Sequence, residues 1–424
     1  MIAPGVAHVL IAVIAGCSIV LMLVRPRKIA EVYWIGGGVL LLLLLLLEPM
    51  GAAARAAARG TDVYLFLIGM MLLSELARTH GVFDWVSAVA VRRANGSCAR
   101  LFALVYGIGT VVTIFMSNDA TAVVLTPAIL TAVRSAKVKP LPHLFACALI
   151  ANAASFVLPI SNPANLVVFR DGMPPLGRWL LWFGLPSVLA IGTTYAVLRV
   201  LFRRDLEEEL TEVVEARDLG GSGRMVLAGL GLMVLVLLGA SALDKPLGLP
   251  TCLAALAITA VVSVKARRNP VELAREISWG TLALVAGLFV MVDAVESVGA
   301  LRLTGAALRW AQGLPEAIGA TVTAVGVGLA NNLVNNLPLG LLASGTLRTV
   351  HAEGLMQKAI LIGIDLGPNL SVTGSLATIL WLIALRKEGL EVSFVDFLKV
   401  GVVAMPVALL TSMGAAIAIE MLLR

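Results

Sequence analysis

The sequence predicts an all-α polytopic membrane protein with two inverted-topology repeats. We expect about ten transmembrane helices, two re-entrant helical hairpins and two broken helices. Apolar residues fill 59% of the 424 positions, whereas charged residues fill 14%. Runs of about 18 or more apolar residues recur along the chain, and a bilayer accepts such runs only as helices that satisfy their own backbone groups. In addition, the second half repeats the first half's motifs in the same order.

Composition and missing motifs exclude several classes of function. The net charge is +6 and the pI about 9.3, but Lys and Arg form short clusters between apolar runs, which is typical of topology signals and not of nucleic-acid binding. The sequence contains no GxxxxGK[ST], HExxH or GxSxG motif, so we expect no enzyme and no cofactor. No CxxC pair exists, so we interpret the cysteines as packing residues and not as metal ligands; they are Cys17, Cys98, Cys147 and Cys252.

The basic clusters determine the predicted topology. All of them are cytoplasmic if the first half crosses at about 3–24, 31–49, 61–79, 141–169 and 178–202. Both chain termini then lie outside the cytoplasmic (inner) membrane of a prokaryotic cell. The clusters are Arg25–Lys28, Arg92–Arg93, Arg134–Lys139, Arg203–Arg204, Lys265–Arg268 and Arg386–Lys387.

Between Arg100 and Arg134, the tetrapeptide "SNDA" divides the chain into two apolar stretches that are each too short to span comfortably. Because both flanks are basic, we predict a re-entrant hairpin with its tip at 117–120. The first repeat then occupies 1–202. A cytoplasmic linker at 203–224 combines an acidic run with a Gly/Ser turn, and the second repeat occupies 225–424.

An offset of 218 residues aligns the two halves. The second hairpin then has its tip at 335–338, where Asp119 has no acidic counterpart. Five crossings and one hairpin per half are an odd number of crossings, so the second half enters the membrane upside down, as in many secondary transporters. The aligned pairs are Gly69 with Gly287, Glu75 with Asp293, Gly81 with Gly299, and Asn118 with Asn336.

Each hairpin is followed by an interrupted apolar segment, "NAASFVLPISNPANL" at 152–166 and "DLGPNLSVTGSLAT" at 365–378. With a five-residue gap, Asn152 aligns with Asp365. Proline and glycine favour unwinding, and we expect the breaks at 158–165 and 365–375. Broken helix at membrane depth is tolerated where it lines a cavity, so the two breaks and the two tips predict one central site.

The predicted site contains many neutral polar side chains and two acids. For any single amide, an interhelical hydrogen bond is the favoured explanation, but about a dozen polar residues at four pseudo-symmetric positions favour a site. A carboxylate inside a membrane helix costs at least about 2.5 kcal/mol, which favours a role in proton coupling for Asp119 and Asp365. Alternatively, Asp119 caps the second helix of its hairpin. The candidate substrate-binding residues are Ser117, Asn118, Ser161, Asn162, Asn165, Asn335, Asn336, Asn369, Ser371 and Thr373.

Charged residues near helix ends are weaker candidates for a functional role. We interpret Glu75, Arg78 and His80, and likewise Asp293 and Glu296, as interfacial anchors or members of local ion pairs. A functional role stays a minor alternative for Glu75 and Asp293, because the repeat aligns them with each other.

At "SNDATAVVLTPAIL" (117–130), "PISNPAN" (159–165), "NNLPLGLLASG" (335–345) and "IDLGPNLSVTGSLATILW" (364–381), the chain resembles the ArsB-type arsenite efflux permeases of the ion transporter superfamily. The resemblance implies extrusion of arsenite and antimonite in exchange for protons, in some members with a cytosolic arsenite-stimulated ATPase subunit. It also implies functional roles for residues of both tips and the second break: Asn118, Asp119, Asn335, Asn336, Asp365, Pro368 and Gly374–Ser375.

The chain departs from the dicarboxylate carriers of that superfamily, which have Ser-Asn-Thr in both hairpins. It has Ser-Asn-Asp and Asn-Asn-Leu instead, which speaks against a carboxylate substrate. Arsenous acid is an uncharged trihydroxide that amides and hydroxyls can bind without a buried countercharge. The alternatives are a sodium/proton antiporter or other small-ion carrier, and a passive metalloid channel.

Overall fold

A computed structural model describes residues 4–170, 172–208, 218–243 and 245–423, and every regular element in these ranges is a helix. The elements of the first half are α1 (Pro4–Val24), η1 (Pro26–Lys28), α2 (Glu31–Leu44), α3 (Met50–Ala58), α4 (Thr61–Thr79), α5 (Val82–Arg93), α6 (Cys98–Met116), α7 (Asn118–Ala120), η2 (Thr121–Leu125), α8 (Thr126–Ser135), α9 (Leu141–Ala153), η3 (Pro159–Ser161), α10 (Pro163–Val168) and α11 (Leu176–Leu201). Those of the second half are α12 (Gly221–Ala242), α13 (Gly248–Ala266), α14 (Pro270–Glu276), α15 (Trp279–Ser297), α16 (Ala300–Gln312), α17 (Glu316–Val334), α18 (Asn336–Val350), α19 (Leu355–Leu366), η4 (Gly367–Asn369), α20 (Leu376–Lys387) and α21 (Phe394–Leu422).

The two halves contain the same order of elements, and their contacts are related by an approximate two-fold axis. Helix α4 packs against α13 as α15 packs against α2, and α6 packs against α9 as α17 packs against α19. Helices α11 and α21 pack against each other. Their residues Thr193 and Thr411 are 218 positions apart, and the two hydroxyls lie 3.3 Å from each other. Equivalent residues that touch must lie on the axis that relates the halves.

Eight described helices are long and apolar enough to cross a membrane. They include α6 and α17, the first arms of the two hairpins. Helix α4 is bent by 51° against the short α3. Two of the expected crossings, α2 and the first part of the broken segment, α9, are shorter, with 14 and 13 residues. The prediction of an all-helical polytopic membrane protein is confirmed.

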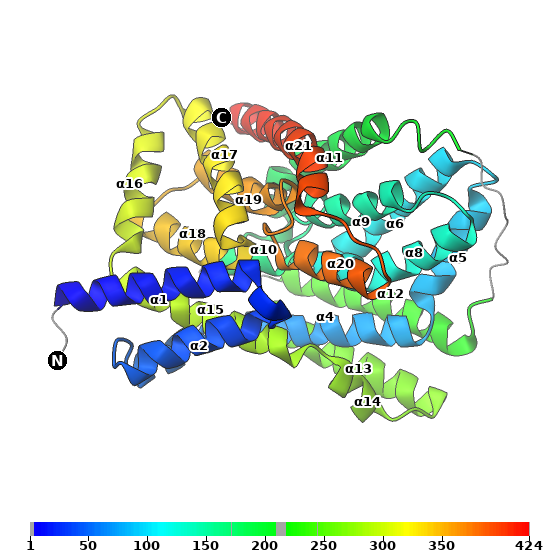
Figure 1. Ribbon diagram of the computed structural model, residues 1–424, viewed down its shortest axis with the longest axis horizontal. Helices are drawn as coiled ribbons and strands as arrows, with labels where there is room; N and C mark the ends of the chain where they lie inside the picture. The colour runs from blue at the N-terminus through cyan, green and yellow to red at the C-terminus, as the bar shows by residue number, and fades with distance from the viewer. Residues whose placement is uncertain (1–3, 171, 209–217, 244, 424) are drawn as a thin grey trace.

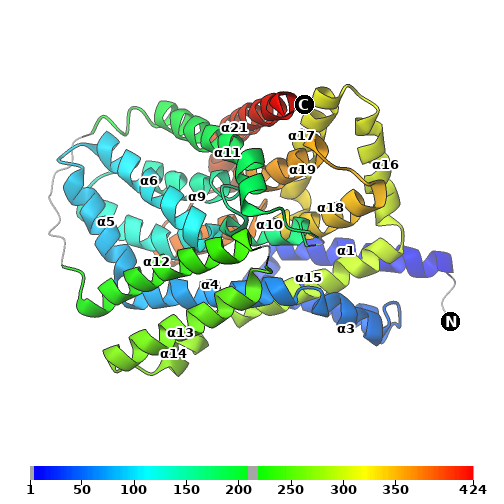
Figure 2. The same cartoon turned by 180° about the vertical axis from the view of Figure 1, so that it is seen from behind.

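The helices are interrupted at Ser117 and at Asn335, within the predicted hairpins. Helix α6 ends at Met116 and α7 begins at Asn118, while α17 ends at Val334 and α18 begins at Asn336. The hairpin of α6 to α8 and the hairpin of α17 and α18 enter from opposite ends of the molecule's long axis (Figures 1 and 2). Their tips therefore point toward the middle.

The breaks differ slightly from the predicted ranges. Helix α9 ends at Ala153 and α10 begins at Pro163, so the first break covers 154–162 and starts earlier than the predicted 158. Proline at the first turn favours a helix start, and the residue before a proline is pushed out of the helical region. The second break covers 367–375, so Asp365 still belongs to α19. In the predicted linker, 221–224 belong to α12, and 209–217 lie outside the described residues.

The ion pairs join loops and helix ends that are predicted to lie on the same side of the membrane. On the predicted cytoplasmic side, Lys139 pairs with Asp205 at 2.8 Å and with Glu208 at 2.7 Å. These carboxylates raise the pKa of Lys139 above its usual value, the hydrogen bond to Asp205 being the largest cause. On the predicted external side, Lys358 pairs with Glu420 at 2.5 Å. Each pair joins loops or helix ends that the basic clusters assign to the same side.

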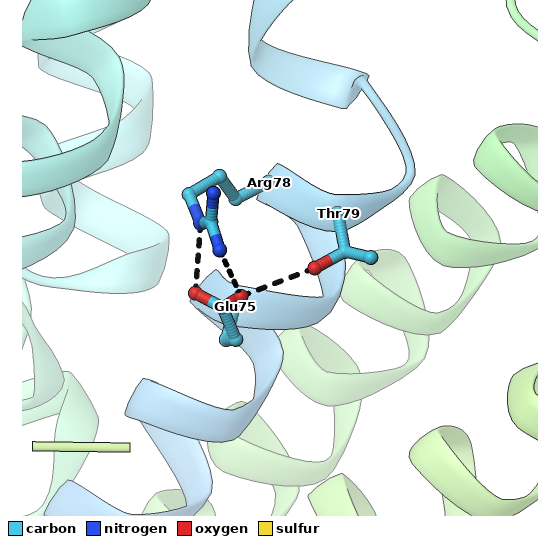
Figure 3. A network of polar contacts seen from close by, with 3 residues as sticks. All are labelled: Glu75, Arg78 and Thr79. Atoms are coloured by element: carbon cyan, nitrogen blue, oxygen red, sulfur yellow. Dashed lines mark hydrogen bonds and ion pairs between the residues drawn. The ribbon is translucent and has the colours of Figure 1, made fainter. Parts of the chain in front are cut away.

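Glu75 belongs to a local ion pair, as predicted. Figure 3 shows Arg78 donating to both carboxylate oxygens, at 2.9 and 2.5 Å, while Thr79 donates at 3.1 Å. The aligned residue Asp293 likewise pairs with Arg59 at 2.7 Å. Both acids therefore have partners at the ends of their helices, which leaves Asp119 and Asp365 as the acids at the tips and breaks.

The aligned glycines Gly69 and Gly287 allow close helix packing. A Cβ atom on Gly69 of α4 would lie 2.8 Å from the backbone oxygen of Thr251 on α13. One on Gly287 of α15 would lie 2.8 Å from a methyl group of Ile35 on α2. Small residues let transmembrane helices approach each other closely, which explains why the glycines recur at this offset.

Replacing Gly69 with Ala is expected to destabilise the protein by about 1–3 kcal/mol, because overpacking forces the two helices apart. The matched control is Gly37→Ala, where a Cβ atom would meet nothing within 4 Å. Thermal unfolding of the two purified variants in mild detergent measures the change in stability that each substitution causes. Equal midpoints for the two variants would contradict the assigned contact.

Candidate functional site

A small cavity of about 10 Å³, room for roughly one water molecule, lies where the two hairpin tips and the two broken helices meet. The scaffold helices α4 and α15 close it from the other side. Its wall therefore contains parts of both halves, as the pseudo-symmetry requires. The lining residues are Leu67, Asn118, Asp119, Asn162, Pro163, Thr281, Val285, Asn336, Leu337, Leu376 and Ala377.

Asn118 and Asn336, the aligned residues of the two tips, both line the cavity. Their side chains are 2% and 3% exposed. The side-chain oxygen of each has no hydrogen-bond partner among the described residues. A buried acceptor without a donor costs about 1–3 kcal/mol, and both of these oxygens are available to a ligand that donates hydrogen bonds.

Both tips hold a residue in a strained backbone conformation. Ser117 has φ 101° and ψ 160°, and Asn335 has φ 78° and ψ 153°. This region is almost restricted to glycine and costs of order 1–3 kcal/mol for other residues. The strain recurs at equivalent positions, directly before the two asparagines that line the cavity. Strain of this kind is concentrated at functional sites.

The two acids have different places. Asp119 lines the cavity. Asp365 is fully buried behind Asn162, whose amide nitrogen donates to its Oδ1 at 2.6 Å. The second oxygen, Oδ2, has no partner among the described residues. The Asn162 oxygen accepts from the backbone N–H of Ala164 at 3.0 Å and so caps α10.

The contact between Asn162 and Asp365 has a counterpart across the two-fold axis. With the five-residue gap, Ser375 is equivalent to Asn162 and Asn152 to Asp365. Ser375 caps α20 by accepting from Thr378 N–H, and its hydroxyl donates to the Asn152 oxygen at 3.3 Å. Each repeat therefore supplies a cap that bonds to the end of the other repeat's broken helix. One of these crossed pairs contains an acid, and the other is neutral.

Six of the predicted substrate-binding residues have bonds within the protein and do not line the cavity. Ser161 donates to Ile114 O at 2.9 Å, Asn165 to Ser155 O at 2.8 Å, and Asn369 to Leu149 O at 3.1 Å. In the second half, Ser371 donates to the Asn332 side chain at 2.7 Å, Thr373 to Asn332 O at 2.9 Å, and Asn335 to Thr373 O at 3.3 Å. These bonds hold the breaks and tips in place. Ser117 likewise forms a tip without lining the cavity.

Sequence reasoning missed several lining residues. Leu67 and Val285 are equivalent under the 218-residue offset, but an apolar residue in a transmembrane helix gives no signal of its own. Thr281 lies on α15, which carries no break. Asn152 and Ser375 were visible in the alignment of the breaks, but their bond to each other was not.

The cysteines lie outside the cavity. Cys147 is buried in α9, and the Cys98 sulfur lies 4.0 Å from the Nε2 atom of His143. The part of the chain that the structure describes contains no group of three or more His, Cys, Asp or Glu side chains able to hold a metal.

The family is decided by a match over most of the chain, since the citrate transporter family model covers residues 6–363. The chain belongs to this family. As a member of the citrate transporter family it is a multi-pass membrane carrier of small molecules and not an enzyme.

Its relatives confirm the resemblance to ArsB-type permeases. An arsenical pump membrane protein of Yersinia enterocolitica is 27% identical, with 84% of this chain and 86% of the relative covered. An arsenical pump membrane protein of Escherichia coli is 25% identical, with the same shares of both chains covered. An uncharacterized transporter of Mycobacterium tuberculosis is 25% identical, with 82% and 83% covered. The solved YdaH transporter of Alcanivorax borkumensis has a similar fold, with a TM-score of 0.59, 16% identity and 86% of each chain covered.

Replacing Ser117 with Gly is expected to raise the thermal unfolding midpoint, because glycine adopts this backbone conformation without strain. Ser117→Val is expected to lower it, since a β-branched residue is least compatible with positive φ. A detergent-solubilised sample serves for both measurements. If Gly and Val lower the midpoint equally, the tip is not strained.

Proposed function

We propose that this carrier exports trivalent metalloids, arsenite and antimonite, across the cytoplasmic membrane in exchange for protons. The observation that carries the proposal is the cavity's polar inventory. Two buried amide oxygens lack donors, and Asp119 is the one ionisable side chain among the lining residues. Arsenous acid offers three hydroxyl donors and no charge, so it suits this wall.

The family's name raises a second candidate, citrate. A tricarboxylate buried in a membrane cavity needs cationic partners, because an unpaired buried charge is very costly. The lining residues include no Lys or Arg, and they include Asp119, which would repel an anion. The names of the arsenical pump relatives support the metalloid over citrate.

Proton coupling requires an acid that changes its charge during the cycle. Asp119 in the wall and Asp365 behind Asn162 are the two candidates, since intramembrane acids usually serve ion or proton pathways. We propose that the tips and breaks move against a scaffold that includes α4 and α15. Protonation from outside then disfavours metalloid binding, and deprotonation toward the cytoplasm restores it.

The orientation is part of the proposal. The basic loops would face the cytoplasm and both termini would lie outside, following the positive-inside rule. Recruitment of a cytosolic arsenite-stimulated ATPase subunit remains a prediction from the resemblance.

Everted membrane vesicles with an acidic lumen test the proposal. We expect wild-type protein to accumulate arsenite against its gradient and to lose this accumulation when a protonophore is added. Replacing both Asp119 and Asp365 with Asn should reduce gradient-driven uptake to the level of vesicles without the protein. Glu75→Gln is the matched control, because this acid is paired at the end of α4, and uptake should persist.

Other outcomes would identify other functions. Uptake of citrate but not arsenite would overturn the substrate. Dependence on sodium and not on the pH gradient would favour a sodium-coupled carrier. Equilibration without accumulation would favour a passive channel.

A further inference from the structure

We propose that Asn162 is the positioning residue through which Asp365 controls the cavity. The inference rests on the proposed proton-coupled efflux and adds how the charge of Asp365 affects metalloid binding in the cavity. Asn162 lines the cavity, caps α10 and bonds to Asp365. One small side chain therefore joins the buried acid to the binding wall.

With Asp365 ionised, both the nitrogen and the oxygen of the Asn162 amide have a partner. Its nitrogen donates to the carboxylate at 2.6 Å, and its oxygen accepts from Ala164 N–H at 3.0 Å. A hydrogen bond to an ionised acceptor is about twice as strong as a neutral one. The amide is thus held in one orientation, and the wall beside Asn118 and Asn336 is fixed in the arrangement that leaves their oxygens open to a ligand.

Protonation of Asp365 weakens this hold. The proton binds at Oδ2, the oxygen that has no partner among the described residues. The bond from Asn162 becomes a neutral one and loses about half its strength. Asn162 can then leave its place at the start of α10, which disturbs the wall where the metalloid binds. The proton and the metalloid therefore disfavour each other's binding, as antiport requires, and no bond within the metalloid changes.

No basic side chain forms a described bond to Asp365. Asn162, which donates to it, and the nearby Ser155, whose hydroxyl donates to Asn152 O at 2.7 Å, are both neutral. Most charged and titratable residues on α19 and on the helices packed against it lie toward the helix ends, whereas Cys147 lies in the middle of α9 and Tyr195 lies within α11. Lys358 is two turns away and is paired with Glu420. Besides these two they are Glu316, Arg348, Asp396, Lys399, His143, Cys147, Arg178, Tyr195 and Arg199.

The neutral crossed pair provides an internal comparison. Ser375 caps α20 and bonds to Asn152, in the same arrangement as Asn162 and Asp365. Because neither side chain titrates, this pair does not change with pH, and it holds the start of α20, whose Leu376 and Ala377 line the cavity. Asn152 is therefore a second position at which an acid should affect the cavity through an equivalent hydrogen bond.

Exchange of radiolabelled arsenite between two compartments of equal pH isolates this effect, since it needs no proton gradient. In wild-type proteoliposomes we expect the KM for arsenite to rise as pH falls, by at most about tenfold per pH unit, the limit for one competing proton. Asp365→Asn should remove the dependence. Asn162→Ala should lower the exchange rate and flatten the profile, whereas Asn162→Ser, which copies the residue of the mirror position, should keep the slope.

The double variant Asn152→Asp/Asp365→Asn moves the acid to the mirror position and should restore a pH-dependent KM that Asp365→Asn lacks. A wild-type slope in Asn162→Ala, with loss of slope in Asp365→Asn, would overturn the role of Asn162 while leaving the acid's role intact. An unchanged slope in both variants would overturn both roles. Absence of arsenite exchange in the wild-type protein would instead overturn the proposed function.

Discussion

The structure depends on one constraint: two broken helices must satisfy their polar groups in the middle of a membrane protein, and each does so with the other repeat's residues. Asn162 bonds to Asp365, and Ser375 bonds to Asn152. These crossed pairs join the halves at the point where backbone is unwound, and the tips then close the space in front of them. Unsatisfied polar groups are most costly where water is absent, so this contact governs where the breaks can lie.

The same constraint explains why the cavity is nearly neutral and yet asymmetric. Many polar groups near the breaks form internal bonds, while the unpaired amide oxygens of Asn118 and Asn336 and the side chain of Asp119 belong to the cavity wall. The repeats keep the backbone equivalent, as the strained residues Ser117 and Asn335 demonstrate. The side chains differ at the two acids, since the aligned counterpart of Asp119 is Leu337 and that of Asp365 is Asn152.

Much of this architecture could be predicted from the sequence. The hairpin tips, the two breaks and the local pairing of Glu75 follow from apolar run lengths, basic flanks and a fixed offset. The division between cavity-lining and structural polar residues could not be predicted, since Ser161 and Asn162 are neighbours of equal polarity and only their partners differ. Apolar lining residues such as Leu67 carry no signal at all, because a lipid-facing leucine has the same sequence context.

The central claim is that trivalent metalloid binds between the amides of Asn118 and Asn336. Anomalous X-ray diffraction from crystals grown with antimonite tests it most directly, since antimony scatters strongly and can be located without assigning the lighter atoms. The account predicts an antimony peak in the cavity, within hydrogen-bonding reach of both amides, that disappears in the double variant Asn118→Ala/Asn336→Ala. A peak beside Cys98 or Cys147, or one that persists in the double variant, would contradict it.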